Sequence, residues 1–211
     1  MPGLLAAAGA VTALVASALG ATPQSEPTPV EAPTELRVNI EGVNGSGCPA
    51  GTTAVSVAPD RTSFTVTYSD YLAQVGLGAD PADFRKNCQL NLSVDVPDGF
   101  TYAIFGLDYR GYAHLADGAS GLQQATHYFQ GSTNDVVVSR EFEGPYDDDW
   151  QVSDDDLGAL VWAPCGEQRN VNINTELRVD SGSSGGSAVS FLAMESTNVP
   201  AATFHLTWKR C

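Results

Sequence analysis

The chain has 211 residues, with ten Lys and Arg against 25 Asp and Glu, and a formal net charge of −15. Nucleic-acid phosphates and anionic membranes bind clustered basic side chains, so this balance argues against nucleic acid and membrane surfaces as partners. The length is sufficient for one domain with a substantial hydrophobic core.

The first 20 residues have the character of a signal peptide. Residues 4–19 are apolar or small and uncharged. This run is shorter than the roughly 20 apolar residues that are needed to span a membrane. Residues 16–18 and 18–20 both carry the small-x-small pattern of a cleavage site. An uncleaved anchor is the alternative, because no Lys or Arg precedes the apolar run. We expect removal of residues 1–20 and a secreted, extracellular protein.

Residues 21–35 contain four prolines and few apolar side chains. Such a composition favours extended polyproline geometry and does not bury enough surface to fold. We interpret 21–35 as a linker or pro-segment, and 36–211 as the folded domain.

Alternation of apolar and polar residues with a period of two recurs through 36–211 and predicts β-strands. Turn-forming Pro, Gly and Asp residues separate the alternating runs. This series favours an all-β fold, a two-sheet antiparallel β-sandwich rather than a barrel. The predicted strands are 36–43, 53–58, 61–69, 90–96, 100–115, 123–129, 136–142, 171–179, 188–194 and 203–208.

Three segments depart from simple alternation. In 100–115 the apolar residues occupy one face at first and then the other, which is typical of a central strand or of one that crosses between sheets. Residues 70–76 hint at a short helix. Residues 181–186, Ser-Gly-Ser-Ser-Gly-Gly, predict a flexible hairpin loop.

The four cysteines are Cys48, Cys88, Cys165 and Cys211. An even number in an exported chain predicts two disulfides, and three pairings are possible. We favour Cys48–Cys88 and Cys165–Cys211, which tie each half of the domain to itself and would each contribute roughly 4 kcal/mol. A metal site is the alternative, but the sequence has no C-x-x-C pair and no histidine near a cysteine.

Acidic residues crowd 141–156, and six of them form two triplets. Calcium takes six to eight oxygen ligands, so triplets brought together across a short strand could bind it. The alternative is a solvated acidic loop, because the spaced pattern of a calcium loop is missing. A pair of these carboxylates could instead hydrolyse a glycoside, although no motif selects two of them. The calcium candidates are Asp147, Asp148, Asp149, Asp154, Asp155 and Asp156.

Aromatic residues in or near predicted loops and the segment 100–115 are candidates for stacking on sugars. The alternative is that most of them pack in the core. The histidines have no partner at ligand spacing, and no G-x-S-x-G motif predicts a nucleophilic serine. The candidate rings are Tyr109, Tyr112, Tyr146, Trp150 and Trp162.

Two N-x-S/T sequences place possible glycans on Asn44 and Asn91. Asn91 lies on the polar face of its predicted strand, where a glycan would have room. The prediction has meaning only in a eukaryotic host.

Seven short motifs, taken together, resemble a family of small secreted fungal and bacterial proteins known as a domain of unknown function, number four-three-six-zero. The resemblance covers nearly the whole domain and implies an exported β-rich protein with four structural cysteines. It supplies no catalytic residue. Arg110 stands in one motif between two tyrosines, so we expect it either to pair with the acidic run or to contact a ligand. The motifs are 45–49, 85–92, 109–112, 143–146, 162–166, 172–175 and 208–211.

From these observations we favour a non-catalytic extracellular module that binds carbohydrate, such as cell-wall polysaccharide. A secreted hydrolase that uses the acidic residues of 141–156 is one alternative. A secreted interaction or effector protein, whose partner is another extracellular protein, is the other.

Overall fold

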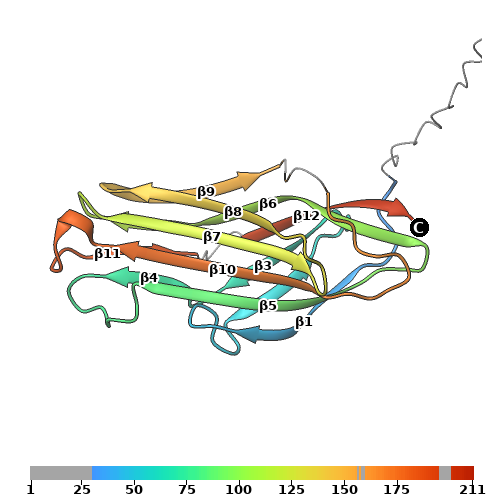
Figure 1. Ribbon diagram of the computed structural model, residues 1–211, viewed down its shortest axis with the longest axis horizontal. Coiled ribbons are helices and arrows are strands. Elements are labelled where there is room, and N and C mark those ends of the chain that lie inside the picture. The colour runs from blue at the N-terminus through green and yellow to red at the C-terminus, as the bar shows by residue number, and fades with distance from the viewer. Residues whose placement is uncertain (1–29, 156, 158–159, 195–200) are drawn as a thin grey trace, which may run out of the picture.

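Two antiparallel β-sheets pack face to face in the computed structural model of the chain (Figure 1). The structure describes residues 30–155, 157, 160–194 and 201–211. The predicted signal peptide, residues 21–29 of the predicted linker and Asp156 lie outside the described residues. The all-β fold predicted from alternation is confirmed, and both sheets are antiparallel throughout.

Sheet A has five strands in the order β1-β5-β10-β7-β8. Its three central strands are long, and most of their inward side chains are apolar and most of their outward ones polar, with Gln123, His127 and Thr175 as buried polar exceptions. The outer face of this sheet is therefore polar. The strands are β1 (Arg37–Asn44), β5 (Arg85–Asp95), β10 (Val171–Asp180), β7 (Ser120–Phe129) and β8 (Val136–Glu143).

Sheet B is built around β6, a strand of 16 residues. One edge of β6 pairs with β12 and then, further along, with β11, while the other edge pairs with β9. The remaining strands extend the sheet in the order β2-β3-β12 at one end and β11-β4 at the other. The strands are β2 (Thr53–Val57), β3 (Ser63–Tyr68), β4 (Leu72–Val75), β6 (Phe100–Leu115), β9 (Tyr146–Asp154), β11 (Ser190–Ala193) and β12 (Ala202–Arg210).

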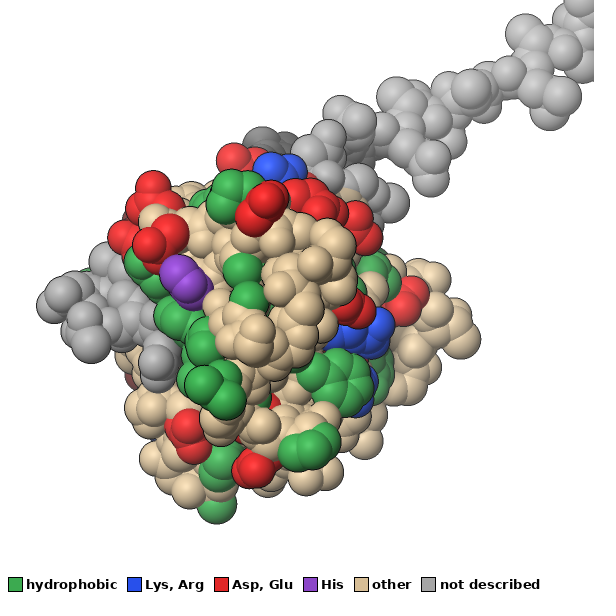
Figure 2. Space-filling view, turned by 90° about the vertical axis from the view of Figure 1, so that its left-hand side faces the viewer, with side chains coloured by type: hydrophobic (Ala, Val, Ile, Leu, Met, Phe, Trp, Pro, Cys, Tyr) green, Lys and Arg blue, Asp and Glu red, His purple; other side chains and the backbone are tan. Residues whose placement is uncertain are grey.

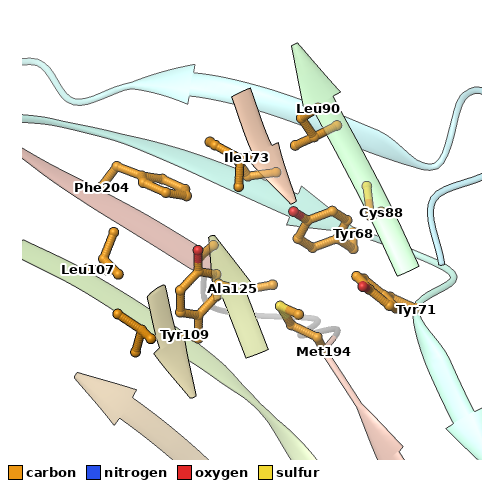
Figure 3. Close-up of a cluster of buried hydrophobic side chains, with 14 of the residues drawn as sticks. Tyr68, Tyr71, Cys88, Leu90, Leu107, Tyr109, Ala125, Ile173, Met194 and Phe204 are labelled. Carbon is orange, nitrogen blue, oxygen red and sulfur yellow. The ribbon is translucent and has the colours of Figure 1, made fainter. Parts of the chain in front are cut away.

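The core lies between the two sheets and contains several tyrosines as well as aliphatic side chains (Figure 3). Phe64 and Phe204 stack at 4.8 Å between ring centroids, and Tyr109 meets Phe204 edge-on. The hydroxyl groups of Tyr71 and Thr175 lie 3.0 Å apart and form a hydrogen bond across the core. Burial of these rings supplies the main favourable contribution to folding.

A β-bulge explains why the apolar residues of 100–115 change phase. His205 pairs with Gly106, but the next residue of β12, Leu206, pairs with Ile104. Phe105 is the extra residue, and its ring is exposed on the outer face. Because the bulge shifts the alternation by one residue, side chains on both sides of it point into the core. The strand is central in sheet B, as predicted.

Three local predictions differ from the structure. Residues 72–75 form β4 rather than part of a helix, because Ala73 is buried beneath the sheet and pairs with Leu192. Residues 146–154 form β9, a strand that the crowded aspartates concealed. Residues 181–186 do not close a hairpin: this segment, with a 3-10 turn at Gly182–Ser184, crosses from β10 in sheet A to β11 in sheet B.

The disulfide pairing Cys48–Cys88 and Cys165–Cys211 is confirmed. The Cα atoms are 5.4 Å and 5.7 Å apart. The first disulfide is buried against β5, and the second is exposed and joins the segment after β9 to the end of β12.

The last residues of the predicted linker lie against the domain. Val30 and Ala32 pack on the core cluster, and Pro33 is buried. The backbone N–H of Val30 donates to the carbonyl of Trp208 at 3.4 Å. In the part of the chain that the structure describes, no helix is long and apolar enough to cross a membrane.

Candidate ligand-binding face

The outer face of sheet B carries a connected group of polar and aromatic side chains over β6, β9, β11 and β12. After the bulge, the even-numbered residues of β6 point outward, and they pair with the odd-numbered residues of β9. Sequence positions far apart are thereby placed on one surface. We call this surface the β6–β9 face: Asp108, Arg110, Tyr112, His114, Asp147, Asp149, Gln151, Ser153, Phe191 and His205.

Three rings form a row at one end of the β6–β9 face. The ring of Phe191 lies 6.1 Å from that of Tyr112 and 5.7 Å from that of His114, at 27° to each. Tyr112 is 37% exposed and the His114 side chain 42%, so the row is open to solvent. We call Tyr112, Phe191 and His114 the ring row.

Asp147 holds two members of the ring row in place. Its Oδ1 accepts a hydrogen bond from the Tyr112 hydroxyl at 2.6 Å and lies 3.0 Å from Nδ1 of His114. These two contacts lower the pKa of Asp147, and the same carboxylate raises the pKa of Tyr112. Asp147 thus links two of the three rings through one carboxylate oxygen.

A second polar group centres on Asp108. Its Oδ2 lies 2.8 Å from Nε2 of His205, and its Oδ1 accepts a hydrogen bond from Ser153 at 2.5 Å. Partial burial acts to raise the pKa of Asp108, but the hydrogen bonds from His205 and Ser153 outweigh it and the pKa is lowered. The carboxylate stands between Ser153 and His205, so these three groups are not ordered as a Ser-His-Asp relay, in which histidine is in the middle.

Arg110 lies between these two groups. Its Nε donates to Oε1 of Gln151 at 3.1 Å, and Gln151 in turn donates to Ser153 at 2.6 Å. The ion pairs found among the described residues do not include Arg110, although its charge helps to lower the pKa of Asp108.

Gly111 is required beneath this face by close packing. A Cβ at this position would lie 1.9 Å from the carbonyl oxygen of Ala193 and 2.6 Å from the indole of Trp150. The absence of a side chain lets β6, β11 and the Trp150 ring approach one another.

The predicted rings are divided between surface and core. Tyr112 is on the β6–β9 face, but Tyr109 is 1% exposed and Trp150 is 3% exposed. For these two rings the alternative of packing in the core holds, because alternation turns them inward, where the ring centroids of Trp150 and Phe142 lie 5.5 Å apart. Buried rings of this kind support the β6–β9 face from within the core.

The other two predicted rings are half-buried. Tyr146 packs edge-on against Phe142, and its hydroxyl donates to the carbonyl of Asp149 at 3.1 Å. Trp162 lies beside β6 through a bridge to Ala103, with Nζ of Lys209 4.3 Å from its ring centroid. Neither ring is part of the ring row.

The structure does not bring the two aspartate triplets together. Asp147 and Asp154 stand at opposite ends of β9, about 23 Å apart at the rise of a strand. Within the first triplet, Asp147 and Asp149 point outward while Asp148 has the opposite orientation. Asp155 follows the strand, and Asp156 lies outside the described residues. Among the residues that the structure describes, no three His, Cys, Asp or Glu side chains form a group able to bind a metal ion.

A carboxyl group that donates a proton in glycoside hydrolysis needs a raised pKa. Every described carboxyl group with a resolved shift has a lowered one, including Asp108 and Asp147 on the β6–β9 face. Asp108 and Asp149 lie four positions apart along paired strands, or about 13 Å, which is beyond the span of either hydrolytic geometry, whereas Asp147 and Asp149 lie two positions apart on one face of β9, or about 7 Å.

The possible glycan sites differ in accessibility. Asn44 is exposed at the end of β1. The Asn91 amide donates to Asn172 at 2.8 Å and accepts a hydrogen bond from Asn170 at 2.5 Å. A glycan on Asn91 would have to displace these contacts.

The fold defines a disulfide-linked all-β protein. The profile of the family described as Domain of unknown function (DUF4360) matches residues 34–211. The chain is also 36% identical over 184 residues to an "Uncharacterized secreted protein" of the fungus Arthroderma benhamiae, which covers 85% of this chain and 74% of the relative. The chain therefore belongs to the DUF4360 family, as its motifs indicated.

Proposed function

We propose that this secreted protein is a non-catalytic module that binds cell-wall polysaccharide through the β6–β9 face. The observation that carries the proposal is the ring row, with Asp147 bound to two of its members. Aromatic rings cover the apolar faces of sugar rings, and neighbouring carboxylates accept hydrogen bonds from sugar hydroxyls. A flat strand surface suits a long polymer better than a small molecule, which favours enclosed pockets.

Charge supports an uncharged or cationic polymer rather than an acidic one. Asp108, Asp147 and Asp149 all lie on this face. Among the described residues that define the face, Arg110 is the one Lys or Arg. Carboxylates repel uronic acids and phosphates but accept hydrogen bonds from hydroxyl and amide groups.

The test is depletion of the purified protein from solution by insoluble chitin, β-glucan, cellulose and peptidoglycan, with calcium and with chelator. We expect one polymer to deplete the wild type, and Tyr112→Ala and Phe191→Ala to lose at least about tenfold in affinity. Phe84→Ala is the matched control, because Phe84 is an exposed ring outside this face, in the β4–β5 connection. Loss of binding in chelator alone would assign a role to calcium at the acidic residues.

Two results would contradict the proposal. One is that none of the four polymers depletes the wild type. The other is that Tyr112→Ala and Phe191→Ala bind as well as the wild type, with circular dichroism and thermal unfolding showing that all variants are folded.

A second candidate, binding to another protein, is favoured by apolar side chains at one end of the sandwich. Leu77 is 80% exposed and Val189 is 43% exposed, and their loops touch where Gly76 meets the backbone of Ala188. Figure 2 shows this end, with hydrophobic side chains separated by polar ones. If this surface rather than the ring row carries the function, the wild-type protein binds no polysaccharide but captures a partner protein. The double variant Leu77→Ser, Val189→Ser then fails to capture that partner.

A further inference from the structure

The outer face of sheet A carries an array of amide side chains in register. Asn174 of β10 pairs with Gln89 on one side and Thr126 on the other, and Glu176 pairs with Asn87 and Gln124. Two consecutive rows of three outward side chains are thus aligned across the central strands. We call these six residues the amide array: Asn87, Gln89, Gln124, Thr126, Asn174 and Glu176.

The amide array surrounds a shallow depression in the sheet. All six residues line it, together with Arg85 at one end and Cys88 and Thr175 beneath. Its volume is about 190 Å³. At about 30 Å³ for each water molecule in the liquid, it holds on the order of six waters. That space matches a single polar ring rather than a polymer.

Four of the six side chains of the array have free hydrogen-bonding groups, whereas Asn87 accepts a hydrogen bond from Ser46 and Glu176 is ion-paired. In the part of the chain that the structure describes, the side chains of Gln89, Gln124, Thr126 and Asn174 make no hydrogen bond to another residue. The next row along the sheet differs, since the amides of Asn91, Asn172 and Asn170 bind one another. A primary amide both donates and accepts, so the free amides can bind two neighbouring hydroxyl groups.

The one acidic member of the array is neutralised. Arg85 donates to Glu176 through Nε at 2.7 Å and also through Nη2, and Arg178 donates to it at 2.6 Å. Partial burial acts to raise the pKa of Glu176, but these hydrogen bonds outweigh it and the pKa is lowered. The carboxylate therefore stays ionised and paired, and the depression lacks the strong negative charge of the chain as a whole.

We propose that the amide array is a second binding site, independent of the β6–β9 face, for one neutral sugar residue. Free amides and a threonine hydroxyl match vicinal hydroxyl or acetamido groups, which also donate and accept. A charged ligand fits poorly, because Arg85 and Arg178 are already occupied by Glu176. Recognition at this site is by hydrogen bonds at the edge of the sugar, without stacking on rings.

The experiment is a titration of isotope-labelled protein, residues 30–211, with soluble cellotetraose, laminaritetraose and chitotetraose, followed by NMR of the backbone amides. We expect at least one of these sugars, at millimolar concentration, to shift saturably the signals of residues 87–89, 124–126 and 174–176. Asn174→Ala should weaken this binding about tenfold, because two hydroxyl partners of the sugar are lost. Asn39→Ala on edge strand β1 is the matched control and should bind as the wild type does.

The proposal is overturned if none of the three sugars shifts the array signals, or if Asn174→Ala leaves the affinity unchanged. The Tyr112→Ala variant separates this site from the proposed function. Array shifts that persist in Tyr112→Ala support an independent site, and array shifts lost in that variant contradict it. If no polymer binds at the β6–β9 face, the NMR signals of the array still measure sugar binding at the amide array.

Discussion

The two outer faces of the sandwich are built by the same alternation but present different chemistry. On sheet A, Gln89, Gln124 and Asn174 leave amides free above a shallow depression. On sheet B, Asp147 already binds Tyr112 and His114 and fixes a row of rings. A free polar group can bind a ligand without first losing a protein contact, whereas a fixed ring gains by being ordered in advance. The net charge of the chain, −15, therefore does not reveal the chemistry of either face.

The two faces also differ in how they are supported. The amide array stands on β5, β10 and β7, the three central strands of sheet A. The β6–β9 face depends on β9, an edge strand that pairs only with β6 among the described strands. Trp150 of β9 packs on Phe142 of β8 and so ties this edge to the other sheet. Perturbations of the core beneath β9 should therefore affect sheet B more than sheet A.

The largest effect is expected from Trp150→Ala. Removal of this buried indole leaves a cavity above Gly111 and should lower the free energy of unfolding by about 3–5 kcal/mol, as measured by urea denaturation. Trp150→Phe retains an aromatic ring and should lose less than half of that. If Trp150→Ala instead abolished polysaccharide binding at unchanged stability, the ring would be a ligand contact and its assignment to the core would be incorrect.

The disulfides provide the next comparison, because one is buried beneath the amide array and the other is exposed at the end of β12. Cys88 is buried under the amide array, whereas Cys165 and Cys211 are exposed at the end of sheet B. Mild reduction followed by alkylation and mass spectrometry should label Cys165 and Cys211 first. Loss of that disulfide removes roughly 2–4 kcal/mol of stability. Labelling of Cys48 and Cys88 first would contradict this order of accessibility.

The fold could be predicted from the sequence because alternation over long strands reports burial directly. The phase change at Phe105 was visible as an irregularity, but only the pairing with His205 and Leu206 identifies it as a bulge. β9 could not be predicted from Asp147, Asp148 and Asp149, since aspartate disfavours strands and only pairing with β6 overrides that preference.

The candidate site was only partly predictable for the same reason. The sequence marks Tyr112 and Asp147 as separate candidates, but their contact depends on the register between β6 and β9. Phe191 and His114 come together because β11 pairs with β6, a long-range pairing with no local signal. The amide array is similarly dispersed over three strands, and no single segment of the sequence marks it.

A smaller effect is expected from pH, through a histidine on the inner side of sheet A. Burial without a hydrogen-bond partner among the described residues lowers the pKa of His127 from 6.5 to about 4. Below pH 6.5 the unfolded chain binds a proton that the folded chain excludes, so stability present at pH 7 is lost as the pH falls toward 4. The loss amounts to at most about 3 kcal/mol.

His127→Leu isolates this contribution, because its apolar surroundings include Ile104, Phe129 and Val136. Urea denaturation at pH 7 and pH 4.5 should show a smaller loss of stability in His127→Leu than in the wild type. Equal losses in both would mean that His127 takes up its proton without unfolding, and that other groups carry the acid sensitivity.

The smallest and most local effect is expected from Asp147→Asn, which tests whether the ring row is fixed by charge. The carboxylate raises the pKa of Tyr112, so its replacement by a neutral amide should lower that pKa toward the ordinary value of tyrosine. NMR titration of the ring signals measures this directly, and Asp148→Asn is the control that should lower the pKa of Tyr112 less, because Asp148 acts on Tyr112 through its charge without a hydrogen bond. If Asp147→Asn lowers the pKa of Tyr112 but retains polymer affinity, ring position alone supports binding at the β6–β9 face. The other outcome is that both the polymer affinity and the pKa of Tyr112 fall, while the NMR signals of the amide array do not change. Binding at the β6–β9 face then depends on the ordering of its rings by Asp147, which is what distinguishes it from the amide array.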